Sequence, residues 1–332
     1  MQDIISLFSS QVCETEAALE KLVLPKREWK NAVLIGMGGS ALGAHVAQTL
    51  FADKLVVPFE WRNSYTIPGY ADEQTLVILS SYSGTTEEVL AAYKEAKARG
   101  LGIVVLTCGG KLAAAAKKDH AASVIYSVES NPGNQPRNGV VYNLVGVWGI
   151  LKIAGLLKDE AKFSCEFAES LDKMAKKHEG GALAKKLARA CTDSVVMLAA
   201  SEHLEGNLHI IQNQTHETAK HFAHFDTVSE LNHHLMEGLK YPNNFARKTT
   251  ALLFHSKLYG TRIKKRYPIT AEVLKKQNVK VFMIELSGKS READVAEMLV
   301  LGMQFSLALA KLHGENPNFI PWVDYFKKKL AV

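Results

Sequence analysis

Short apolar runs alternate with longer amphipathic segments along the chain. In the first half, each run is about as long as a strand, and the segment that follows it, such as residues 40–52, places apolar residues at helical spacing. These runs span residues 31–35, 55–61, 75–81, 102–107 and 123–128. Continuous apolar runs are typical of strands that are buried on both faces of a parallel sheet, so the pattern predicts an α/β fold.

A second series of the same kind occupies the second half. A helical stretch at residues 140–157 and a charged helical segment at residues 159–190 separate the two series. The later apolar runs span residues 194–200, 223–228, 250–256 and 279–286, and the expected helices among them span residues 262–277 and 291–312. The repetition predicts two similar domains, each a parallel sheet flanked by helices.

The changes in pattern also predict where these domains begin and end. We expect an N-terminal helix and a first domain in residues 1–155, a helical linker in residues 156–190, and a second domain with a C-terminal helical tail in residues 191–332. A chain of 332 residues, with 47% hydrophobic and 22% charged residues, suits about two globular domains.

The same pattern argues against a membrane or secreted protein. No uninterrupted apolar run approaches the ~18 residues of a membrane span, and the N-terminal stretch lacks a basic region. The four cysteines lie far apart with no C-x-x-C pair, which argues against a zinc site and a disulfide framework. We therefore expect a cytoplasmic protein that does not bind a membrane.

The net charge of the chain bears on which kind of ligand or partner it binds. The net charge is +6, but the basic runs lack the interleaved aromatic residues of a nucleic-acid platform. A small anionic ligand suits this excess equally well. We therefore expect a small-molecule partner and no nucleic acid.

A glycine-rich turn, IGMGGSALG, joins the first expected strand to the first expected helix. The free backbone N–H groups at such a helix start form an anion site. Gly36, Gly38 and Ala41 fit the dinucleotide-binding pattern, and Glu60 stands near the position of a ribose-binding acid. A nicotinamide-dependent dehydrogenase is therefore one alternative.

Two residues at the tip of this turn argue for another ligand. Gly39 and Ser40 present close backbone and a hydroxyl group, which a pyrophosphate-binding turn does not need. A tight strand-to-helix turn without any ligand is the remaining alternative, because glycine is also selected for conformation alone.

A second strand–turn–helix segment, TLVILSSYSGTTEEVL, concentrates hydroxyl groups at one helix start. Ser81, Ser83, Thr85 and Thr86 surround Gly84. Each hydroxyl can donate to a phosphate oxygen, and the free N–H groups of the helix add further donors, so the segment predicts a monophosphate pocket. A capping box, which needs only one hydroxyl and a following glutamate, is the alternative.

The stretch HETAK, residues 216–220, stops one residue short of the zinc-protease motif H-E-x-x-H. Lys220 stands where the second histidine ligand would be. Seven of the twelve histidines lie between His203 and His234, which invites a metal site, but such a site needs three or four converging ligands. We predict no metal, with most of these histidines at the surface or satisfied in the core.

Several ordered motifs resemble those of one family. VLIGMGGSALG followed by LVILSSYSGTTEEVL is similar to the sugar isomerase (SIS) domain, a flavodoxin-like fold that binds phosphosugars. SNPGNQPRNGVVYNL, QTHETAK, SELNHHLMEGL and VDYFKKKL then follow in the order of the bifunctional phosphoglucose/phosphomannose isomerase family. The resemblance runs from about residue 31 to the C-terminus and implies two flavodoxin-like SIS domains.

The resemblance assigns roles residue by residue. The phosphate-binding residues of the family fall on Ser81, Ser83 and Thr86, and its glycine-loop substrate contacts fall on Gly38, Gly39 and Ser40. It places the arginine near C1 and C2 on Arg137, the catalytic glutamate on Glu217, the ring-opening histidine on His233 and the C-terminal lysine on Lys327, with Lys328 and Lys329 as neighbouring candidates.

The chain departs from the family pattern at several of these motifs. His216 and Thr218 replace the asparagines that flank the glutamate, and His234 replaces the asparagine after the histidine. Near the tail, Asn316-Pro317-Asn318-Phe319 stands where many members read D-P-T-P. The first changes alter hydrogen bonds around the site, and the last bears on whether the C2 epimer is accepted.

The resemblance implies an aldose–ketose isomerase that interconverts glucose 6-phosphate and fructose 6-phosphate in glycolysis and gluconeogenesis. Mannose 6-phosphate is the further substrate that it implies. Such a reaction needs a carboxylate base and a cation near the enediolate oxygens, roles that fit Glu217 and Arg137 without a metal or cofactor. The family also implies a homodimer in which His233 reaches the partner subunit's site. A non-catalytic phosphosugar sensor is the alternative, because SIS domains also serve as regulatory modules.

Overall fold

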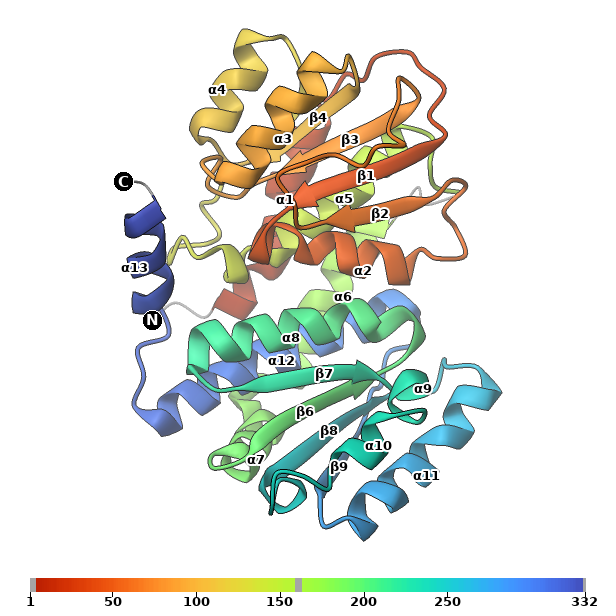
Figure 1. Ribbon diagram of the computed structural model, residues 1–332, viewed down its shortest axis with the longest axis vertical. Coiled ribbons are helices and arrows are strands. Elements are labelled where there is room, and N and C mark those ends of the chain that lie inside the picture. The colour runs from red at the N-terminus through yellow and green to blue at the C-terminus, as the bar shows by residue number, and fades with distance from the viewer. Residues whose placement is uncertain (1–3, 159–162, 331–332) are drawn as a thin grey trace. The chain divides into compact units, whose positions relative to one another are not determined.

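The computed structural model describes residues 4–158 and 163–330, which form two compact units (Figure 1). The first unit comprises the described residues up to Lys177 together with Glu202–Ile210 and Gly288–Glu297. The second comprises His178–Ser201, Ile211–Ser287 and the described residues from Met298 onward. Each unit is built around its own parallel sheet, as the apolar runs predict.

The first unit contains a five-stranded sheet in the order β2-β1-β3-β4-β5, with all neighbouring pairs parallel. This is the flavodoxin-like order, in which the chain changes direction of winding beside β1. The strands are β1 (Asn31–Gly36), β2 (Phe59–Arg62), β3 (Thr75–Ser80), β4 (Gly102–Thr107) and β5 (Ala122–Ile125). The helices of this part of the chain are α1 (Phe8–Leu19), α2 (Leu42–Leu50), α3 (Glu87–Ala98), α4 (Gly110–Lys118), α5 (Val140–Ile153) and α6 (Phe163–Lys177).

The second strand begins later than its apolar run predicts, and the helix expected at residues 140–157 ends earlier. The second strand begins only at Phe59, because Val56 donates its N–H to the carbonyl of Leu156 (3.1 Å) instead of pairing with β1. The helix expected over residues 140–157 ends at Ile153. Gly155 then adopts a φ of +72°, a left-handed conformation that favours glycine and that commonly ends helices.

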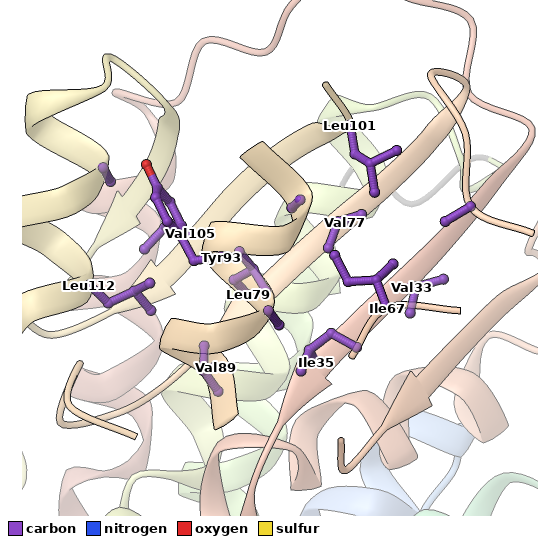
Figure 2. Packing of buried hydrophobic residues seen from close by; sticks show 14 residues of the cluster. Val33, Ile35, Ile67, Val77, Leu79, Val89, Tyr93, Leu101, Val105 and Leu112 are labelled. Atoms are coloured by element: carbon purple, nitrogen blue, oxygen red, sulfur yellow. The ribbon is translucent and has the colours of Figure 1, made fainter. Parts of the chain in front are cut away.

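The two faces of this sheet are covered by different helices, because successive strand residues point to opposite sides. On one face, Val77 and Leu79 of β3 join a buried cluster with Val89 and Tyr93 of α3 and with Leu112 of α4 (Figure 2). The alternate residues of β3, Ile78 and Ser80 among them, therefore face the other side.

Helix α5 covers that other side and is buried along nearly its whole length. Gly146 gives room for Leu106 of β4, since an added Cβ would lie 2.5 Å from a Leu106 methyl carbon. Helices α1 and α2 pack against α5. The apolar sequence of α5 thus follows from burial on several sides, which leaves little room for polar groups.

The second unit contains a four-stranded parallel sheet in the order β7-β6-β8-β9. Its strands are β6 (Val195–Ala200), β7 (Ala223–Thr227), β8 (Thr249–His255) and β9 (Lys280–Glu285). Its remaining helices are α7 (Ala182–Cys191), α9 (Val228–Leu231), α10 (Leu235–Gly238), α11 (Thr261–Lys276) and α13 (Pro321–Leu330). Helices α8 (Glu205–Ala219) and α12 (Arg291–His313) contribute residues to both units.

Helix α12 is long and apolar enough to cross a membrane by length and composition, with a mean hydropathy of 1.5 over its 18-residue window. However, 72% of that window is buried inside the protein. A core helix of a soluble protein passes the same test. The helix packs as part of the two α/β units.

A pair of histidines makes contact within the first unit. His45 of α2 is 7% exposed and stacks on Trp61 of β2 with 3.6 Å between ring centroids. Its Nδ1 lies 3.0 Å from Nδ1 of His209 in α8, so one nitrogen donates and the other accepts. Burial, and secondarily the neighbouring His209, lower the pKa of His45 to about 3.

This lowered pKa predicts a loss of stability in mild acid. Below its ordinary pKa of 6.5, His45 takes up a proton in the unfolded chain but not in the folded one. Between that pH and about pH 3, the free energy of unfolding therefore falls as the pH falls, by about 1.4 kcal/mol per pH unit from this residue. Urea unfolding at pH 7 and pH 5 measures the loss, and H45F is the comparison because it keeps the ring but cannot titrate. An equal loss in both proteins would contradict the assignment.

Candidate active site

The glycine loop, residues 36–41, links β1 to α2 in the first unit. Gly38 adopts a φ of +50°, and η2 (Gly38–Ser40) forms a single 3-10 turn before α2 begins at Leu42. A Cβ added to Gly39 would lie 2.9 Å from the carbonyl carbon of Pro136. Glycine at this position therefore lets the backbone before Arg137 approach the loop closely.

The hydroxyl loop, residues 81–86, links β3 to α3. The hydroxyl oxygens of Ser81 and Thr86 lie 2.8 Å apart, and those of Ser83 and Thr85 lie 2.9 Å apart. Ser81 also accepts a hydrogen bond from the Gly84 amide (3.1 Å). All the hydroxyls singled out from the sequence thus lie in one turn at the start of a helix, where they can donate to an anion.

The capping-box alternative does not account for this loop. Thr86 is the N-cap residue of α3, yet it makes no side-chain hydrogen bond to the helix backbone. Its hydroxyl pairs with Ser81 instead. Glu87 and Glu88 occupy the first turn of α3, where their charge is favourable toward the helix dipole.

Arg137 lies in η3 (Pro136–Asn138) and is 1% exposed. Its Nη1 donates to Oε1 of Gln135 (2.8 Å). Asn131 holds the same segment by donating from Nδ2 to the Gln135 carbonyl (2.9 Å) and to the hydroxyl of Tyr82 (2.8 Å). Burial raises the pKa of Tyr82, so this hydroxyl stays neutral and fixes the Arg137 segment beside the hydroxyl loop.

The first unit therefore brings together three segments that are far apart in the sequence. Gly39 touches the backbone beside Arg137, and the hydroxyl of Ser40 accepts a hydrogen bond from the Tyr82 amide (2.8 Å). The segment that carries Arg137, a tight turn with backbone N–H groups and a loop of hydroxyls thus adjoin one another after the carboxyl ends of β1 and β3. Donors of this kind can bind a small phosphorylated ligand.

The predicted glutamate and its neighbours lie near the end of α8, within the second unit. Glu217 is partly buried. His216 points toward the start of β7, where its Nε2 lies 2.9 Å from the carbonyl oxygen and 3.1 Å from the amide nitrogen of Ala223 and its ring stacks on Phe222. Lys220 adopts a φ of +53° and closes the end of the helix by donating from Nζ to the carbonyls of Glu217 (2.9 Å) and Asn316 (2.8 Å).

The other predicted residues of the second unit are exposed. His233 follows α9, and its amide donates to the Glu230 carbonyl (2.9 Å). The next residue, His234, lies 3.3 Å from the Glu230 carboxylate. Lys327 lies on α13, as do its neighbours Lys328 and Lys329. Glu217, His233 and Lys327 belong to the second unit. The glycine loop, the hydroxyl loop and the segment with Arg137 belong to the first unit.

The clustered histidines have separate partners. Nε2 of His203 lies 3.3 Å from Asp294, and His209 contacts His45 in the first unit. In the second unit, His221 lies 3.1 Å from His313, and burial lowers its pKa. Among residues 4–158 and 163–330, no three histidine, cysteine or acidic side chains are grouped so that they could hold a metal ion.

Sequence reasoning missed the residues that hold the loops together. Asn131, Tyr82, Ser80 and Asn143 lie within the quoted motifs but were given no role there, and the structure shows that each makes a buried hydrogen bond between segments. One signal was available for Asn143, because an amide inside the apolar helix expected at residues 140–157 needs a partner when it is buried.

Comparisons with known proteins agree with the fold of two parallel sheets flanked by helices. A family model of the SIS domain matches residues 27–145, and a model described as the bacterial phospho-glucose isomerase C-terminal SIS domain matches residues 181–330. Among solved structures, a hypothetical protein of Thermus thermophilus superposes with a TM-score of 0.75 at 20% identity, covering 99% of this chain and 90% of that one. The fold and these domains define a protein built from two sugar isomerase domains.

Similarity over nearly the whole chain identifies the family. A bifunctional phosphoglucose/phosphomannose isomerase of Caldicellulosiruptor bescii is 32% identical over 91% of this chain and 89% of its own length. Another from Aquifex aeolicus is 29% identical over 91% of both chains. The chain therefore belongs to the bifunctional phosphoglucose/phosphomannose isomerase family and is an enzyme of the isomerase class. This confirms the resemblance and disfavours the dehydrogenase alternative.

The hydroxyl loop predicts a strong intolerance of substitution at Gly84. Gly84 has a φ of +65°, and an added Cβ would lie 1.8 Å from the Gly109 carbonyl oxygen. Gly100 is the matched control, because its φ is +66° and an added Cβ would meet nothing within 4 Å. We expect G100A to lower the free energy of unfolding by about 1 kcal/mol, and G84A to lower it by about 3 kcal/mol or more. Urea unfolding measures both values, and equal losses would contradict the close approach of Gly109.

Proposed function

We propose that the enzyme interconverts glucose 6-phosphate and mannose 6-phosphate with fructose 6-phosphate by metal-free proton transfer through an enediolate. The observation that carries the proposal is the meeting of the glycine loop, the hydroxyl loop and Arg137 in the first unit. Relatives over nearly the whole chain are named for phosphoglucose and phosphomannose isomerisation. A site of hydroxyls and backbone N–H groups suits the phosphate of such sugars.

In this proposal the hydroxyl loop binds the phosphate through Ser81, Ser83, Thr85 and Thr86. Gly38, Gly39 and Ser40 then contact the sugar. A phosphate fixed at one end places the C1–C2 end at a set distance, so binding energy from the unreactive end orients the reacting carbons. The spacing between the two loops therefore bears directly on catalysis.

The chemical step in this proposal uses two groups of opposite charge. Glu217 removes the proton from C2 of the open-chain aldose, and the electrons of that C–H bond form the enediolate while the C1 carbonyl oxygen becomes negative. Arg137 is always charged and donates to this oxygen, which lowers the energy of the developing anion. The proton of the C2 hydroxyl passes to the C1 oxygen, and the carboxylic acid of Glu217 returns a proton to C1, giving the ketose. Rotation of the enediolate about its C2–C3 bond turns the other face of C2 toward Glu217, and return of the proton there gives the epimeric aldose.

Closed sugar rings must open before this step. We assign ring opening to His233, because imidazole exchanges protons near neutral pH, and we assign help at the ring oxygen or phosphate to Lys327. The exposed position of His233 suits a role in the site of a partner subunit, so the proposal includes a homodimer. A cytoplasmic location and a place in glycolysis and gluconeogenesis follow from the sugar phosphates involved.

The base assignment predicts the effect of E217Q. Glutamine keeps the size of the side chain but cannot accept the C2 proton, so we expect kcat to fall by roughly 10³-fold. Binding of fructose 6-phosphate, measured by isothermal titration calorimetry, should stay within about threefold of the wild type. E237Q, an exposed change in α10 of the same unit, is the control. Retained turnover in E217Q would refute the assignment.

The substrate range is tested by a coupled assay with fructose 6-phosphate and with mannose 6-phosphate, run in excess chelator. We expect turnover of both, since the proposed groups stabilise the enediolate without a metal. Turnover of fructose 6-phosphate alone would mean that the altered segment Asn316-Pro317-Asn318-Phe319 narrows the choice of epimer. Thermal stabilisation by phosphosugars without any turnover would instead support the non-catalytic sensor.

A further inference from the structure

Asn143 is a buried amide within the apolar helix α5. Its side chain is 3% exposed, and a buried amide is costly unless both of its ends form hydrogen bonds. Both ends are used here. Oδ1 accepts from the Gly43 amide (2.7 Å), and Nδ2 donates to the hydroxyl of Ser80 (2.8 Å). The amide therefore connects the start of α2 to the end of β3.

The direction of each hydrogen bond in this network is fixed. The Gly43 N–H can only donate, which determines which end of the Asn143 amide is the oxygen. Ser80 thus accepts from Asn143, and its own hydrogen goes to the Ser40 carbonyl (2.7 Å). The Tyr82 amide can likewise only donate, so the Ser40 hydroxyl accepts from it (2.8 Å) and keeps its hydrogen for donation to a ligand.

This network lies just beyond the end of the sheet, where strand pairing no longer sets the distance between the segments that follow β1 and β3. The pairing of β1 with β3 extends from Asn31 opposite Thr75 to Gly36 opposite Ser80. Beyond that pair, the glycine loop and the hydroxyl loop leave the sheet in separate turns. The hydrogen bonds of Asn143, Ser80 and Ser40 then join the two loops immediately after the last strand pair.

We propose that Asn143 and Ser80 are positioning residues that set the spacing between the glycine loop and the hydroxyl loop. The proposal rests on the proposed function, in which the phosphate binds one loop and the sugar contacts the other. A ligand that reaches both loops depends on their spacing, whereas inorganic phosphate needs the hydroxyl loop alone. The network therefore determines selectivity for a phosphosugar over free phosphate.

The substitution S80A tests this proposal. Alanine removes the hydroxyl that accepts from Asn143 and donates to Ser40, and the strand pairing through the backbone is untouched. By calorimetry, we expect affinity for fructose 6-phosphate to fall roughly tenfold and affinity for inorganic phosphate to change by less than about twofold. KM should rise by a similar factor with kcat changed by less than about threefold. S80T restores the hydroxyl and should recover most of the lost affinity.

T75V is the matched control at the opposite end of the same strand. Thr75 is fully buried, and its hydroxyl contacts the Asp72 carboxylate (3.3 Å) and accepts from the Asp72 amide (3.0 Å). Valine keeps the shape but removes these hydrogen bonds, so T75V should lower the melting temperature without changing the affinity ratio of the two ligands. This comparison separates loop spacing from general loss of stability.

The outcomes separate this proposal from the proposed function. Equal losses for both ligands in S80A, or unchanged affinities, would overturn the positioning role. Wild-type protein that binds fructose 6-phosphate without turning it over would overturn the proposed reaction, while the affinity ratio in S80A would still decide the role of the network. Wild-type protein that binds phosphate but not fructose 6-phosphate would overturn both.

Discussion

The parallel pairing of β1 with β3 is the constraint on which the candidate site depends. It places Gly36 opposite Ser80, so the glycine loop and the hydroxyl loop begin at the same edge of the sheet. Parallel strands bring the starts of successive helices to one edge, where unpaired N–H groups point outward. The two loops, which are far apart in the sequence, therefore form a single group of hydrogen-bond donors.

The two loops of the proposed anion site contain hydroxyls and glycines and no lysine. Arg137 supplies a permanent charge from a third segment, and Asn131 and Tyr82 hold that segment in place. A buried guanidinium held through its neighbours has little freedom to lose on binding a ligand. The arrangement favours a rigid site over a flexible cationic surface.

The histidine-rich region shows how a sequence cluster can be dispersed by folding. His216 and His221 are close together in the sequence, but His216 contacts the backbone of Ala223 and His221 contacts His313. His209 instead joins His45, far away in the sequence. Residues on successive elements point in different directions, so closeness in the sequence does not produce converging ligands.

The sequence by itself determined the α/β class, most strand positions and the two loops, because buried parallel strands require continuous apolar runs and tight turns require glycine and hydroxyl residues. It also identified the family through motifs that keep their order. Only the tertiary structure decided that Thr86 pairs with Ser81 rather than capping α3, and that Asn143 and Ser80 join the two loops. These contacts join residues distant in the chain, and a side chain's hydrogen-bond partner depends on the position of other elements, which no local pattern of residues specifies.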